Sequence, residues 1–108
     1  EVLEDDQAAA RRTEGYALDR VIDLLNAAAA APPKSREGVE ALHYTFELWS
    51  TFVHDLSSEQ NALPPEVRGN LLSIGIWILK EIDAIRLGKS ANYSGIADIC
   101  TIIRDGLR

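Results

Sequence analysis

The sequence predicts an all-α protein: a four-helix-bundle-like single domain over residues 1–108, with a long first helix. Apolar residues recur at intervals of three and four in four segments, and no segment shows sustained period-two alternation. Proline and glycine lie between these segments, which places the helices at about residues 3–31, 36–56, 65–87 and 91–106. The connections are short, so successive helices are expected to run antiparallel, as in a helical bundle.

The first helix is predicted to end at Pro32 and Pro33, because proline cannot continue a helix. Acidic residues at its start suit the positive end of the helix dipole. Gly15 lowers helix propensity, so the polar half before it is expected to be hinged or to order with a partner. The apolar stripe of this helix is Leu18, Val21, Ile22 and Leu25.

The second helix follows Ser35, a residue type that favours the N-cap position. Its expected core stripe is Val39, Leu42, Phe46, Trp49, Phe52, Val53 and Leu56. The third helix is predicted to begin at Pro65 and to stop at Gly88. Its stripe is Leu71, Ile74, Ile78, Ile82 and Ile85, widened by Leu72, Gly75 and Leu79.

The fourth helix is expected to start near Ser90 and to end near Gly106. Its stripe is Tyr93, Ile96, Ile99, Cys100, Ile103 and Leu107. Cys100 is therefore expected to be a buried structural thiol rather than a nucleophile.

The charge balance is acidic, with 17 Asp and Glu against 11 Lys and Arg, a net charge of −6 and a pI near 4.8. Such a field repels phosphate backbones and anionic lipid, so neither direct nucleic-acid binding nor a membrane partner is expected. A single cysteine forms no internal disulfide, which favours the cytoplasm. The chain begins at Glu1 and has no methionine, so we expect that a short leader has been trimmed.

The residues that could carry chemistry do not form a known constellation. His43 and Glu47 are one helical turn apart, but His54 is about 16 Å further along the axis, so we expect no metal. No phosphate-binding loop and no GxSxG or HExxH motif occurs. The sequence therefore predicts no enzyme and no cofactor.

Apolar residues exceed what a small bundle needs to close its core. Tyr44, Leu48, Ile76 and Trp77 lie off the main stripes of their helices. They either meet inside the core or scatter on the surface, or they line a groove for an amphipathic helix of another protein. Tryptophan is frequent at binding hot spots, which favours Trp77 as an interface residue.

Several strings resemble the flagellar biosynthesis regulator FlaF family of alphaproteobacteria. They are E-V-L-E-D-D-Q-A-A-A-R-R (1–12), Y-A-L-D-R (16–20), N-A-L-P-P-E-V-R (61–68), S-I-G-I-W (73–77) and I-I-R-D-G-L (102–107). The resemblance spans nearly the whole chain. It implies a cytoplasmic, non-catalytic protein that associates with flagellin, promotes its export through the flagellar type III apparatus, and regulates flagellin synthesis alongside the regulator FlbT.

Three hypotheses follow from these observations. In the first, the chain is a flagellin-binding export chaperone and regulator that uses Tyr44, Leu48, Ile76 and Trp77, with Leu3 in a hinged cover. In the second, it is a translational regulator acting on flagellin messenger RNA directly or through an RNA-binding partner, with strongly salt-dependent binding. In the third, it is an obligate homodimer that buries the same apolar surface on itself.

Overall fold

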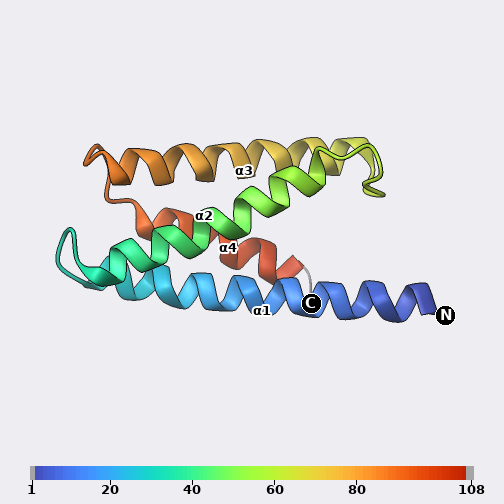
Figure 1. Cartoon of the computed structure of the whole chain (residues 1–108), viewed down its shortest axis with the longest axis horizontal. Coiled ribbons are helices and arrows are strands. Elements are labelled where there is room, and N and C mark those ends of the chain that lie inside the picture. The colour runs from blue at the N-terminus through green and yellow to red at the C-terminus, as the bar shows by residue number, and fades with distance from the viewer. Residues whose placement is uncertain (1, 107–108) are drawn as a thin grey trace. The chain divides into compact units, whose positions relative to one another are not determined.

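The structure is a computed structural model that describes the backbone of residues 2–106 and the side chains of residues 15–106. These residues form four helices and no strand: α1 (Val2–Ala30), α2 (Arg36–Leu56), α3 (Pro65–Arg86) and α4 (Tyr93–Gly106) (Figure 1). The predicted all-α fold with a long first helix is confirmed, and each bound lies within two residues of the expected one. None of the described helices combines the length and the hydropathy required to cross a bilayer.

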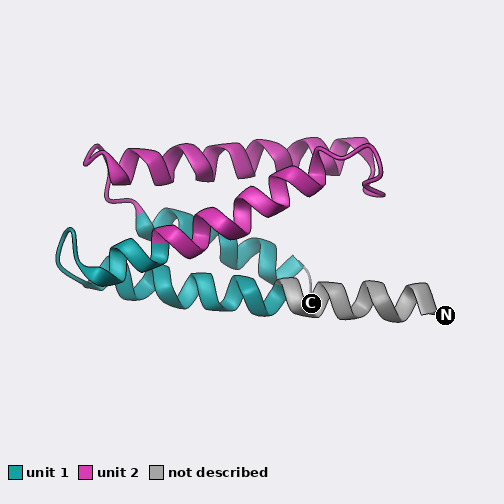
Figure 2. Ribbon diagram, viewed as in Figure 1, with its two compact units in different colours: residues 1–41, 93–108 teal, residues 42–92 magenta. Residues whose placement is uncertain are grey.

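Two compact units make up the chain, one of residues 1–41 with 93–108 and one of residues 42–92 (Figure 2). In the first unit, α1 and α4 pack against each other and run in opposite directions (Figure 1). Leu18, Leu25, Ile96 and Cys100 are fully buried, as their helical spacing predicts. Leu107, the last residue of the predicted α4 stripe, lies outside the described residues.

The glycines of the first unit have different surroundings. The helical backbone of α1 continues through Gly15, where an added Cβ would meet no atom within 4 Å. Gly38, in contrast, lies so close to Tyr93 that an added Cβ would be 2.7 Å from the phenol oxygen. The start of α2 thus lies against the Tyr93 side chain at the start of α4.

The connection from α1 to α2 differs in one detail from the sequence prediction. Lys34 adopts a left-handed conformation with φ of 60°, and the Ser35 carbonyl accepts the first helical bond, from the Val39 N–H. The hydroxyl of Ser35 is buried and makes no hydrogen bond, so the predicted side-chain cap is wrong. Ser35 marks the start of α2 through its backbone alone.

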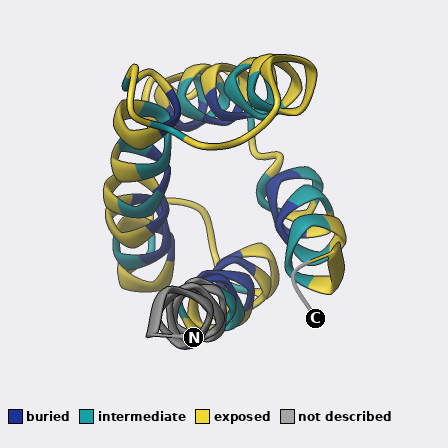
Figure 3. Ribbon diagram, turned by 90° about the vertical axis from the view of Figure 1, so that its right-hand side faces the viewer, coloured by how far each residue is buried: buried dark blue, intermediate teal, exposed yellow. Residues whose placement is uncertain are grey.

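The second unit is built on α2 from residue 42 and on α3, which run antiparallel (Figure 1). Gly75 is a point of close approach, because a Cβ added there would be 2.6 Å from Val53 Cγ2 and 3.3 Å from Trp49 Cε3. Trp49 is fully buried and meets Phe52 edge to face, with ring centroids 5.3 Å apart. The buried side of α3 continues along the helix as predicted, with Ile78, Ile82 and Ile85 (Figure 3).

The corner between α2 and α3 is built by side chains that bond to backbone. The amide of Asn61 donates to the Asp55 carbonyl at 3.2 Å, while its oxygen accepts the Leu63 N–H at 3.0 Å. The Arg68 guanidinium donates to the Ser58 carbonyl at 3.4 Å. Pro occupies the first position of α3, where its missing N–H costs nothing.

The end of α3 is a Schellman motif, as the predicted glycine stop implies. Gly88 has φ of +75°, and its N–H donates to the Ile85 carbonyl at 3.0 Å. The Lys89 N–H donates to the Ala84 carbonyl at 2.8 Å, which closes the motif. The next helix starts at Tyr93, two residues later than expected, because the Ser90 hydroxyl accepts the Asn92 N–H and holds a turn there.

The buried face of α2 differs from the predicted stripe. Val39 and Phe46 were expected in the core, but they are 67% and 39% exposed. Thr45 and Ala41, which lie four and eight residues before Trp49, are buried in their place. At about 100° per residue, Thr45 and Ala41 lie about 40° and 80° to one side of Trp49, whereas Phe46 and Val39 lie about 60° and 80° to the other side.

Candidate functional site

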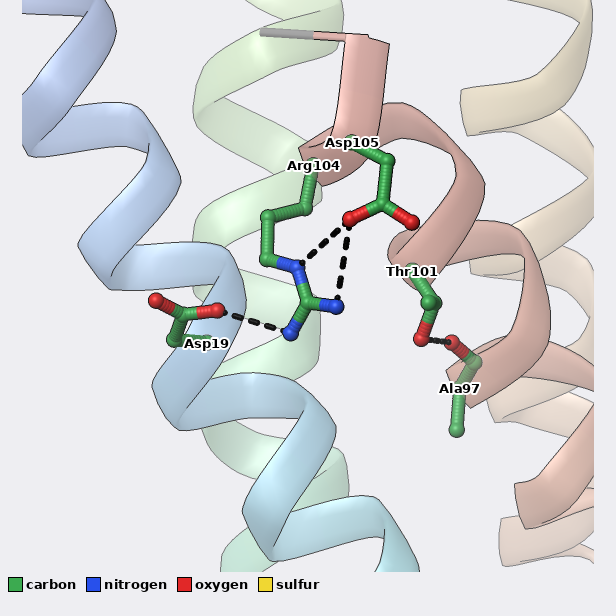
Figure 4. A network of polar contacts seen from close by, with 5 residues as sticks. All are labelled: Asp19, Ala97, Thr101, Arg104 and Asp105. Atoms are coloured by element: carbon green, nitrogen blue, oxygen red, sulfur yellow. Dashed lines mark hydrogen bonds and ion pairs between the residues drawn. The ribbon is translucent and has the colours of Figure 1, made fainter. Parts of the chain in front are cut away.

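A polar network joins α1 to α4 in the first unit (Figure 4). Arg104 Nη1 donates to Asp19 Oδ1 at 2.8 Å, and its Nε and Nη2 donate to Asp105 Oδ1 at 3.2 Å. The hydrogen bond to Asp19, followed by the contribution of Asp105, raises the pKa of the Arg104 guanidinium above its ordinary value. The positively charged Arg104 guanidinium thus lies between two carboxylates. Its bond to Asp19 links α4 to α1, so the role of the network is structural.

The groups with catalytic or ligating potential do not gather in the part of the chain with described side chains. His43 Nε2 lies 3.3 Å from Glu47 Oε1, an ion pair when the imidazole is protonated, and both groups are exposed. Over these residues, no three His, Cys, Asp or Glu side chains come together in a group that could hold a metal ion. Cys100 is buried in the core of the first unit.

Exposed large apolar side chains are the chief surface feature of the second unit. Their positions span both helices and the corner between them: Tyr44, Phe46, Leu63, Val67, Ile76, Trp77 and Leu87. Ile76 and Trp77 follow Gly75 directly and are 46% and 39% exposed. Their exposure rules out, for these two residues, the alternative that they meet inside the core.

The predicted site residues do not form one cluster. Leu48 is half-buried and Tyr44 is 38% exposed, both on α2. Leu3 lies outside the residues whose side chains the structure describes. The described part of the predicted site therefore consists of four residues, all in the second unit.

Helix geometry separates those four residues. Leu48 precedes the contact residue Trp49 by one position, whereas Ile76 follows the contact residue Gly75 by one. Successive residues turn by about 100°, and α2 and α3 run antiparallel (Figure 1). It follows that Leu48 and Ile76 lie on opposite flanks of the helix contact. Tyr44, one turn before Leu48, lies about 140° around α2 from Trp49, on the side of Leu48 but turned away from α3. Trp77 lies on the outer side of α3, next to Ile76.

Phe46 is the residue that the sequence interpretation missed. It lies on the same flank as Ile76, and the Arg86 guanidinium carbon is 5.2 Å from its ring centroid. Leu72 and Leu79 are half-buried on this flank, one turn before and one turn after Ile76. We call the side of the α2–α3 contact that carries Phe46, Leu72, Ile76 and Leu79 the Phe46–Ile76 flank. The sequence carried no signal for the exposure of Phe46, because the spacing of Phe46 and Val53 predicts two core positions.

Together these features define a small all-helical protein with exposed aromatic and aliphatic side chains on an antiparallel helix pair. Over residues 1–107 the chain matches the family model described as Flagellar protein FlaF. The chain therefore belongs to the FlaF family, as its sequence strings indicate, and its role lies in flagellum biogenesis. Comparison with curated proteins and with solved structures gave no match.

Proposed function

We propose that this protein binds flagellin as an export chaperone and regulates flagellin synthesis and secretion during flagellum assembly. The observation that carries the proposal is the exposure of Ile76 and Trp77, side by side on α3, in a chain of the FlaF family. Apolar side chains of this size contribute most to binding when they become buried against a partner. The proposed site is therefore on the α2–α3 unit.

The proposed partner segment is a terminal amphipathic helix of flagellin. Such helices polymerise when free, so a protein that covers their apolar face keeps flagellin monomeric before export. An amphipathic helix binds through residues at positions i, i+3, i+4 and i+7, the helix-in-groove mode of recognition. On α3, Leu72, Ile76 and Leu79 have the spacing i, i+4 and i+7; Ile76 is exposed, and Leu72 and Leu79 are half-buried.

We propose that regulation of flagellin synthesis depends on the same binding equilibrium between this protein and flagellin. A protein that binds flagellin exists in free and occupied forms, and the ratio of the two changes with the concentration of unexported flagellin. We propose that the regulator FlbT, acting in the cytoplasm, responds to this ratio. No catalysis is required in this scheme, because occupancy alone carries the signal.

Isothermal titration calorimetry with purified monomeric flagellin tests the proposal. Flagellin lacking its N-terminal region and flagellin lacking its C-terminal region are titrated separately, each at low and at moderate salt. We expect binding that depends weakly on salt and is lost with one of the two deletions. Absence of binding to intact flagellin would refute the proposal, and tight binding to flagellin messenger RNA that weakens steeply with salt would favour the translational alternative.

A further inference from the structure

We draw no further inference here: the strongest candidate, the exposed apolar surface that the Phe46–Ile76 flank and Trp77 form on the α2–α3 unit, is an unpartnered helix face, and nothing in the structure shows what covers it.

Discussion

Replacement of Gly75 by alanine perturbs the contact on which the α2–α3 unit is built. The new Cβ would be 2.6 Å from Val53 Cγ2 and 3.3 Å from Trp49 Cε3. Trp49 is fully buried and Val53 is β-branched, so neither side chain moves aside without leaving a preferred rotamer. Relieving the clash therefore separates the helices or strains a side chain, and overpacking of this kind costs about 1–3 kcal/mol.

A second effect of the same substitution acts in the opposite direction. Alanine is better than glycine inside a helix by about 1 kcal/mol. Gly69 lies on the same helix, and a Cβ added there would meet no neighbouring atom within 4 Å, so Gly69→Ala isolates this favourable effect. We expect Gly69→Ala to raise the free energy of unfolding by about 1 kcal/mol. Gly75→Ala is expected to lower it by about 1 kcal/mol, the steric cost less the helix gain.

Urea and thermal unfolding, followed by far-ultraviolet circular dichroism, measure both free energies. A gap of about 2 kcal/mol between the variants corresponds to roughly 8 °C in melting temperature for a chain of this size. Val53→Ala removes the methyl group nearest to the new Cβ, so Gly75→Ala should cost less in that background. Equal shifts for Gly69→Ala and Gly75→Ala, or no relief by Val53→Ala, would refute the close approach.

The remaining predictions concern a helix end, an ion pair and the binding site. Gly88→Ala should lower the free energy of unfolding by about 1 kcal/mol in urea, because alanine disfavours the left-handed conformation that Gly88 adopts. Asp19→Asn should lower the melting temperature by weakening the link from α1 to Arg104, and the difference should shrink in high salt; an unchanged melt would show that the link is not stabilising. Trp77→Ala should weaken flagellin binding by about 1 kcal/mol or more while the melt stays cooperative. Unchanged affinity in calorimetry would remove Trp77 from the site.

The helix positions and the buried face of α3 were predictable from the sequence. Proline and glycine determine where a helix begins and ends, and apolar spacing determines which face is buried, within a few neighbouring residues. Ile78, Ile82 and Ile85 follow a regular stripe of large residues, and all three are buried. The face of α2 was predicted less well, since the prediction placed the largest apolar residues inside. Its buried face instead includes Ala41 and Thr45, small residues whose burial a stripe of large residues does not reveal.

The candidate site shows a similar limit. The sequence placed Ile76 and Trp77 outside the α3 stripe but left open whether they are exposed, and the structure shows that they are. The grouping of Ile76 with Phe46, and its separation from Leu48, was not, because it depends on which side of α2 meets Gly75. That is a property of the helix pair, and the hydrophobic pattern of each helix alone does not contain it.

The string at residues 73–77, which carries part of the family resemblance, combines two physical roles. The Ser73 hydroxyl donates to the Gly69 carbonyl within α3, and Gly75 permits the contact with α2, so both have a structural explanation. Ile76 and Trp77 are exposed, and large apolar side chains on a surface gain free energy only when something else buries them. The glycine sets the position of the helix, and the next two residues occupy the surface that this position creates. A partner of this protein is therefore best sought with variants of these two residues, in a background where Gly75 is left intact.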